Sequence, residues 1–139
     1  PLKAIDFCKK QLKVLEGKKI AILGLAFKPD TDDMREARVI PIIKNLLSEG
    51  AQVIAYDPVA ISMAKTIFKD SICYANSAID CLKKADCCIL VTEWPEFKKL
   101  TPDDFIKNMN QPILIDGRRI YEPEEFSKKL KFTAIGLGQ

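Results

Sequence analysis

The chain has 139 residues, of which 47% are hydrophobic and 29% charged, and this length and composition are typical of one soluble globular domain. No apolar stretch approaches the roughly 20 residues that span a bilayer, and the lysines are spread along a chain with a formal charge of only +3, so we expect neither membrane nor nucleic-acid binding. Five cysteines without C-x-x-C spacing, and no histidine, indicate a reducing, cytoplasmic setting and no metal site.

The chain begins at Pro1 and runs directly into an amphipathic stretch containing Leu2, Ile5, Phe7, Leu12 and Leu15. A start without an initiator methionine or a signal peptide indicates a piece of a longer polypeptide. We therefore expect residues 1–16 to be the end of a connecting helix from an absent upstream domain. Residues 17–139 are expected to form the domain itself.

Strands and helices are predicted to alternate through the rest of the chain. Short apolar runs predict strands at residues 20–23, 51–56, 72–74, 86–91, 112–116 and 132–136. Helical spacing of apolar residues predicts helices around 39–47, 61–68, 77–84 and from Thr101 onward, with Pro102 in the first turn. Repeated β-α units imply a largely parallel sheet with right-handed crossovers. The fold class is therefore α/β, a three-layer α/β/α sandwich with a Rossmann-like sheet of five to six strands.

Three cysteines lie in predicted strands: Cys73 in the short strand, and Cys87 with Cys88 in the apolar run 85–91. Buried cysteine behaves as a small hydrophobic residue. We expect all three in the core rather than in catalysis.

The loop of residues 24–36 follows the first predicted strand and precedes the first amphipathic helix of the domain. Ligands of parallel sheets bind at such strand ends, and helix N-termini favour anions, so Lys28 and Arg35 are candidate phosphate contacts. Three aspartates also lie in this loop, and Asp33 with Glu36 has capping-box spacing. The alternative is an ordinary solvated loop.

This loop lacks the usual dinucleotide fingerprint, because Ala26 and Pro29 stand where G-x-G-x-x-G has its second and third glycines. NAD lying across this turn in the usual way is therefore not expected. Asp57 follows the second strand, where a Rossmann fold carries its ribose-binding acid. A simple Asp-Pro turn is at least as good an interpretation.

A parallel sheet gathers its strand-end loops at one edge. This edge would hold Phe27 and Lys28, Asp57, residues 92–94 and residues 116–118. We expect Phe27, Lys28 and Arg118 to come from neighbouring strand ends and to face a common hollow.

These segments resemble the carboxyl-terminal domain of the UDP-glucose/GDP-mannose dehydrogenases: Gly-Leu-Ala-Phe-Lys at 24–28, Thr-Asp-Asp-Met-Arg-Glu at 31–36, Tyr-Asp-Pro at 56–58, Thr-Glu-Trp at 92–94 and Asp-Gly-Arg at 116–118. The resemblance covers residues 17–136 and is greatest to the UDP-glucose 6-dehydrogenases. It implies oxidation of a nucleotide sugar to its uronate with two NAD+. The catalytic cysteine and the NAD-binding domain lie upstream in such proteins, so the chain alone is expected to be inactive.

The resemblance also implies roles for individual residues. Phe27, Lys28 and Arg118 match substrate contacts, and Arg35 matches an arginine that approaches NAD. Catalytic residues are not expected in this chain. Ala37 and Arg38 stand where the family commonly has Ser-Pro, with a proline instead at Pro41, which would displace the helix start.

The implied partners are the UDP-sugar, the N-terminal domain of the same polypeptide and a second copy in a homodimer. The same domain of a GDP-mannose or UDP-N-acetylhexosamine dehydrogenase is an alternative. So is a stand-alone nucleotide-binding module, or an interaction module in which Trp94 and Phe97 form a dimer contact.

Overall fold

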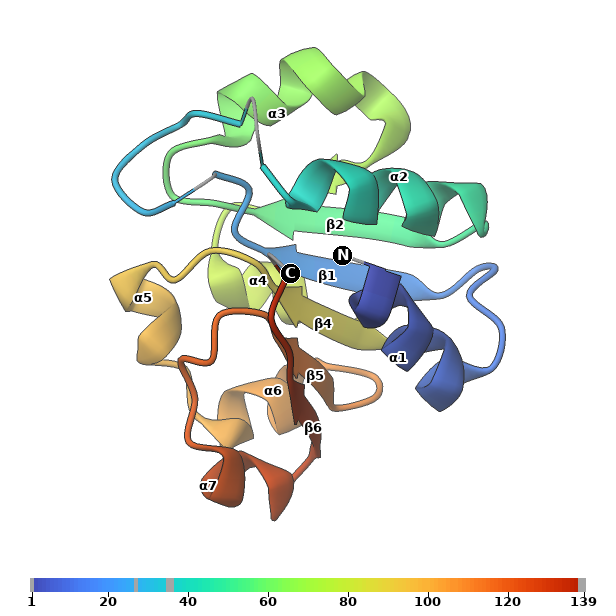
Figure 1. Ribbon diagram of the computed structural model, residues 1–139, viewed down its shortest axis with the longest axis vertical. Helices are drawn as coiled ribbons and strands as arrows, with labels where there is room; N and C mark the ends of the chain where they lie inside the picture. The colour runs from blue at the N-terminus through green and yellow to red at the C-terminus, as the bar shows by residue number, and fades with distance from the viewer. Residues whose placement is uncertain (1, 27, 35–36, 138–139) are drawn as a thin grey trace.

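The computed structural model describes residues 2–26, 28–34 and 37–137, in which strands and helices alternate as predicted (Figure 1). In chain order the elements are α1 (Leu2–Leu12), β1 (Lys19–Leu23), α2 (Val39–Ser48), β2 (Gln52–Tyr56), α3 (Ile61–Phe68), the 3-10 turn η1 (Lys69–Ser71), β3 (Cys73–Tyr74), α4 (Ala78–Leu82), β4 (Cys87–Leu90), α5 (Pro95–Lys98), α6 (Pro102–Asn108), β5 (Ile113–Asp116), α7 (Pro123–Ser127) and β6 (Lys131–Ala134).

The six strands form one sheet in the order β3-β2-β1-β4-β5-β6, and each neighbouring pair is parallel. This is the order of a dinucleotide-binding Rossmann sheet. The chain runs outward from β1 through β2 to β3, then crosses to β4 and runs outward the other way. The strand order therefore reverses between β1 and β4, and the crevice expected of such a switch point lies at their carboxyl ends.

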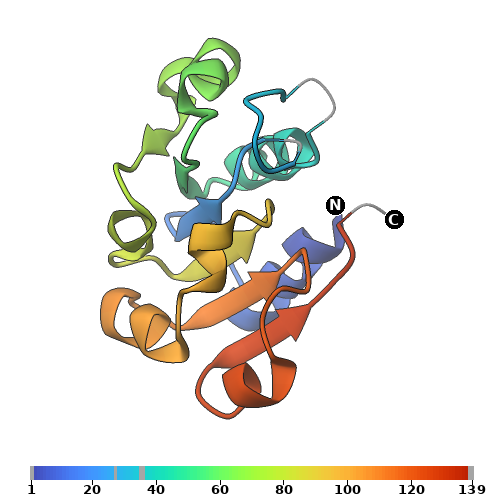
Figure 2. The same ribbon diagram turned by 90° about the vertical axis from the view of Figure 1, so that its left-hand side faces the viewer.

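Two helical layers enclose the sheet, which confirms the predicted three-layer sandwich. One core cluster packs α1, α2 and α3 against strand residues such as Ile22 and Ile89, and a second packs α4, α5, α6 and α7 against residues such as Leu23 and Leu90. Successive strand residues point to opposite faces, so both faces of β1 and β4 are apolar and buried. In Figure 2 the layer with α1 and α2 and the layer with α4 and α6 lie on opposite sides of the sheet.

Helix α1 belongs to the same core as the strands. The crossovers after β4 and β5 place α6 and α7 on the second face, which leaves the first face of that half of the sheet without a crossover helix. α1 covers it, and it contacts α2 and β5. The thiol of Cys8 lies 3.6 Å from that of Cys87, sulfur to sulfur, within this packing.

The prediction that Asp33 caps α2 is wrong, because α2 begins only at Val39, after Arg38, and has no side-chain cap. Pro41 explains this start. A helix beginning at Val39 places the proline in its first turn, where backbone N–H groups have no partner within the helix. A helix capped by Asp33 would hold Pro41 in its interior, at a cost of about 3 kcal/mol. Glu36, the other half of the expected box, lies outside the described residues.

Two cysteine predictions are confirmed and one is wrong. Cys87 and Cys88 are fully buried in β4, one on each face of the sheet. Cys73 is exposed, because the two-residue strand β3 forms the edge of the sheet and is covered less than its interior. Burial raises the pKa of the Cys88 thiol well above its usual value, as expected for a core residue.

The segment after β4 leads into the short helix α5, with Pro95 at its first position. Trp94 and Phe97 are buried in the second core cluster. They therefore cannot form the dimer contact considered from the sequence. None of the helices in the described part of the chain has the length and apolar character needed to cross a membrane.

Candidate functional site

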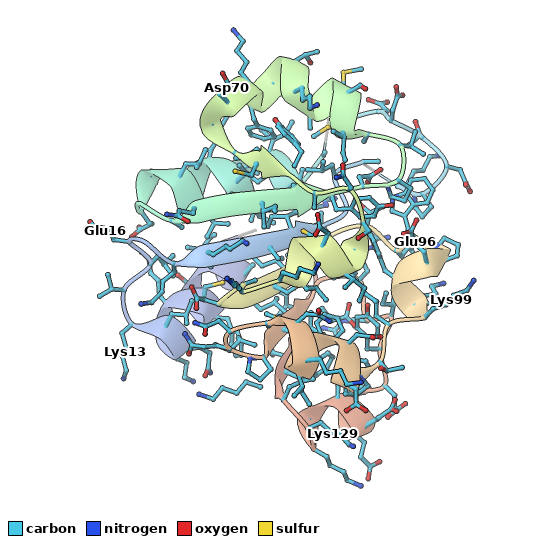
Figure 3. The ribbon with its side chains drawn as sticks, turned by 180° about the vertical axis from the view of Figure 1, so that it is seen from behind. Lys13, Glu16, Asp70, Glu96, Lys99 and Lys129 are labelled. Carbon is cyan, nitrogen blue, oxygen red and sulfur yellow. The ribbon has the colours of Figure 1, made fainter. Side chains whose placement is uncertain are left out.

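The candidate site is the edge of the sheet at which the strands end. In Figure 1 the arrows of β1, β2 and β4 point toward it, and Figure 2 is viewed onto it. Glu96 and Lys99, on and just after α5, lie at this edge in Figure 3, opposite Lys13 and Glu16 at the other end of the sheet. The turns that follow β1, β2, β4 and β5 meet here because the strands are parallel.

Asp57 ties three of these turns together. Its side chain is 2% exposed, and its Oδ2 accepts hydrogen bonds from the backbone N–H groups of Leu25 at 2.8 Å and Ala26 at 3.1 Å. The indole N–H of Trp94 donates to the same oxygen at 2.9 Å. Oδ1 accepts from the N–H groups of Val59 and Ala60, each at 2.9 Å, in an Asp turn that leads into α3.

These contacts decide between the two interpretations of Asp57. Both carboxylate oxygens are used within the protein, so the turn interpretation is confirmed and a ribose-binding role is not supported. The N–H groups of Leu25 and Ala26 are the ones that a pyrophosphate would meet in a Rossmann turn. A dinucleotide lying across this turn would have to displace the Asp57 carboxylate.

The turn after β1 also packs directly on the segment after β4. Gly24 has a φ of +101°, and a Cβ added there would lie 2.5 Å from the Thr92 backbone nitrogen and side chain. The Thr92 hydroxyl donates to the carbonyl of Ala26 at 2.8 Å. Glycine is needed at position 24 both for its backbone angle and for this close approach.

The turn after β5 is anchored by a second buried acid. Asp116 is fully buried and accepts from the N–H of Arg118 at 3.1 Å and of Tyr121 at 2.9 Å. The Tyr121 hydroxyl donates to the carbonyl of Phe97 at 2.6 Å, which ties this turn to α5. Gly117 lies so close to Leu137 and to the Leu90 carbonyl that a side chain would collide with both.

The guanidinium of Arg118 forms an ion pair with Glu93, with both side chains 36% exposed. Arg118 is thus held at the surface of the edge by a loop of the neighbouring strand. β4 separates β1 from β5, so the expectation that Lys28 and Arg118 come from neighbouring strands is wrong. Their strands are two strand spacings, about 10 Å, apart.

Lys28 is exposed in the loop after β1. Phe27 and Arg35, the other two predicted site residues, lie outside the described residues. The structure therefore places two of the four predicted contacts at the same edge. Within residues 2–26, 28–34 and 37–137, no group of three or more His, Cys, Asp or Glu side chains could hold a metal ion.

The tyrosines of this edge are held in their neutral form. The Tyr56 hydroxyl donates to Glu96 at 3.2 Å, and burial, followed by the charge of Glu96, raises the pKa of Tyr56 above its usual value. Burial also raises the pKa of Tyr121. At neutral pH both phenols remain hydrogen-bond donors. Both tyrosines therefore help to hold the loops of this edge in place.

Sequence reasoning missed the partnership of Glu93 with Arg118 and the reach of Asp57 to Leu25, Ala26 and Trp94. The residues involved are far apart in the sequence, and only the order of the strands brings them together. The Asp-Pro pair did signal the local part of the Asp57 network, the turn into α3.

Comparison with known proteins agrees with this geometry. Residues 21–123 match the model of the UDP-glucose/GDP-mannose dehydrogenase family, UDP binding domain. The UDP-glucose 6-dehydrogenase AglM of Haloferax volcanii is 46% identical over 125 residues, which cover 90% of this chain and 28% of that protein.

Two solved structures have the same fold. A UDP-glucose dehydrogenase from Pyrobaculum islandicum has a TM-score of 0.79 at 30% identity, over 96% of this chain and 28% of that one. An NDP-N-acetyl-D-galactosaminuronic acid dehydrogenase from Methanosarcina mazei has a TM-score of 0.78 at 26% identity, over 97% of this chain and 28% of that one. The chain thus spans little more than a quarter of the length of these relatives. It belongs to the UDP-glucose/GDP-mannose dehydrogenase family and corresponds to its UDP binding domain.

Proposed function

We propose that this chain is the nucleotide-sugar-binding domain of an NAD-dependent UDP-glucose 6-dehydrogenase, which converts UDP-glucose to UDP-glucuronate in the cytoplasm. The observation that carries the proposal is the family match over residues 21–123, which includes the strand-end loops bearing Lys28 and Arg118. The name of the Haloferax volcanii relative supports glucose as the sugar.

Lys28 and Arg118 would bind the diphosphate, with Phe27 contacting the substrate beside them. Ammonium and guanidinium groups form charge-assisted hydrogen bonds with phosphate oxygens, and the planar guanidinium can do so in a bidentate manner. A UDP-sugar is long enough to meet cations that follow β1 and β5. Both residues position the substrate and neither takes part in bond breaking.

NAD would accept the hydrides removed from the sugar alcohol. The turn after β1 does not fit its pyrophosphate, because Asp57 already occupies the N–H groups of Leu25 and Ala26. We therefore assign NAD binding mainly to an N-terminal domain of the same polypeptide, with Arg35 reaching the cofactor from this chain. Residues 1–16 would connect the two domains, and the full-length protein would act as a homodimer.

Titration calorimetry of the chain with UDP tests the proposal. UDP is expected to bind, and Lys28→Ala and Arg118→Ala are each expected to weaken binding by about tenfold, the loss of one charge-assisted contact. Lys131→Ala is the control, because Lys131 lies at the opposite end of the sheet in a basic pocket of about 470 Å³. Equal losses in all three variants would indicate unspecific anion binding.

Two further measurements separate the alternatives. GDP binding tighter than UDP binding would favour a GDP-mannose enzyme. The chain alone is expected to reduce no NAD+ with UDP-glucose, and turnover by it would contradict the division of labour between domains. If UDP does not bind at all, the proposed function is wrong.

A further inference from the structure

Asp57 stands out among the buried acids of this chain because its partners come from three different strand-end turns. Five N–H groups converge on one carboxylate, and no Lys or Arg side chain bonds to it among the described residues. A buried charge is tolerated only where hydrogen bonds satisfy it, and bonds to a charged acceptor are worth about 1.5–3 kcal/mol each. The three turns are therefore fixed relative to one another by a single side chain.

We propose that Asp57 is the positioning residue of the nucleotide-sugar site. The proposal rests on the proposed function, since it concerns how the UDP-binding loop is held. Oδ2 fixes the N–H groups of Leu25 and Ala26, which immediately precede Phe27 and Lys28 in the chain. The direction in which the loop leaves β1 is thus set by a carboxylate that directly follows β2.

The Asp57 carboxylate takes the place that a phosphate group has in a dinucleotide-binding Rossmann turn. There the N–H groups after the first strand meet a pyrophosphate. Here they meet an anion of the protein itself, which satisfies the turn without a ligand. The ligand must then be met by side chains farther along the loop, which is where Lys28 lies.

Trp94 extends the same arrangement to β4. Its indole N–H donates to Oδ2 at 2.9 Å, and its ring is buried in the second core cluster. Glu93, which holds Arg118, directly precedes it in the chain. Asp57 therefore acts on Lys28 through the turn after β1, and through Trp94 it fixes the segment after β4 whose Glu93 pairs with Arg118.

The test is calorimetric titration of UDP into the wild-type chain and its Asp57→Asn variant. Asparagine keeps the shape but turns one acceptor oxygen into a donor, so either Oδ1 or Oδ2 loses its partners. We expect the dissociation constant to rise about tenfold in the folded variant, since misplacing a contact by about 1 Å has large effects on a positioned site. A purely structural role would lower the number of binding sites per chain and leave the dissociation constant unchanged.

Asp86→Asn is the matched control. Asp86 is also buried and accepts from the backbone of Lys19 and the side chains of Asn110 and Gln111, but at the opposite end of the sheet. We expect it to destabilise the chain and to leave the UDP dissociation constant within about twofold of wild type. A rise equal to that of Asp57→Asn would show that lost stability, and not loop position, weakens binding.

Trp94→Phe provides a second, milder variant in case Asp57→Asn does not fold, because it removes one donor and keeps an aromatic ring. A rise of about threefold in the UDP dissociation constant is expected from the loss of one hydrogen bond. Trp94 is the single tryptophan of the chain, so its indole N–H gives one resonance in an ¹H–¹⁵N spectrum, and this resonance should shift in Asp57→Asn.

The outcomes separate the two proposals. If wild type does not bind UDP, the proposed function fails and the positioning role fails with it. If wild type binds and folded Asp57→Asn binds equally well, Asp57 is not a positioning residue, while the proposed function stands. Unchanged binding by Trp94→Phe, where Asp57→Asn does not fold, would also overturn the inference.

Discussion

Arg118 and Glu93 form an ion pair that joins the turn after β5 to the segment after β4. The Glu93 carboxylate offsets the charge of Arg118, one of the two cationic side chains that we propose to bind UDP. Because both side chains are partly exposed, the pair adds little to folding stability, on the order of 0.5 kcal/mol. Its effect should therefore be seen in ligand binding.

Replacing Glu93 with glutamine is expected to tighten UDP binding by about threefold, because the diphosphate no longer competes with a carboxylate for Arg118. Titration calorimetry at low and high salt measures this, and the gain should shrink as salt is added. Glu96→Gln removes a charge from the same edge without touching Arg118, and should have a smaller effect. Weaker UDP binding by Glu93→Gln would mean that the pair orients the arginine for its ligand.

Gly24→Ala should destabilise the fold by about 3 kcal/mol or more, since it adds a Cβ at positive φ and forces it against Thr92. Urea unfolding followed by circular dichroism gives this free energy. Gly17→Ala is the control, with a φ of +76° and no atom within 4 Å of the added Cβ. It should cost only about 1 kcal/mol, and equal costs at the two positions would argue against the contact with Thr92.

One thiol per chain is expected to react with Ellman's reagent in the folded state at pH 8. Cys73 is exposed, whereas Cys8, Cys81, Cys87 and Cys88 are buried. Addition of urea should release the other four thiols together, as the fold opens. The Cys73→Ser variant should show no rapid reaction, and a fast signal that remains in it would contradict the burial of the other four.

Folding stability is expected to fall as the pH rises above about 9. Burial raises the pKa of Cys81 to about 12, while in the unfolded chain this thiol titrates near its ordinary value. Between these two pKa values the unfolded chain has lost a proton that the folded chain keeps, so alkali favours unfolding. For Cys81 alone the loss between pH 8 and pH 10 is on the order of 1 kcal/mol.

Urea titrations at these two pH values provide the measurement. Cys81→Ala should lower the stability at both, through the cavity it leaves, but should reduce the difference between them. The buried thiols of Cys87 and Cys88 have raised pKa values as well and contribute in the same direction. Stability independent of pH between 8 and 10 would contradict these shifts.

The sequence predicted the strands well because each is a short apolar run between polar turns, and it predicted α3 at residues 61–68 within its observed bounds. It failed where a residue or strand outside the local pattern decides. Asp33 has good capping spacing, but Pro41 fixes the helix start five residues later than that spacing implies. Cys73 lies in a strand as predicted, yet only the strand order shows that this strand is an edge.

The same limit applies to the site. Lys28 and Arg118 could be assigned to one edge of the sheet because parallel strands end on the same side. That β4 lies between them, and that its loop supplies the partner of Arg118, follows from the crossover after β3, which no local pattern records. The five donors around Asp57 come from residues up to 37 positions away, so only the local turn was visible in the sequence.

The packing of α1 has a consequence for anyone shortening this protein. One core cluster contains Cys87, Ile89 and Ile115 of the sheet together with Ala4, Ile5 and Cys8 of α1. A chain begun at residue 17 would therefore expose the apolar surface of β4 and β5 on this side of the sheet to water. Such a truncated product should self-associate and bind hydrophobic dyes even though every strand is retained. The first helix thus covers one face of the sheet as well as leading into β1.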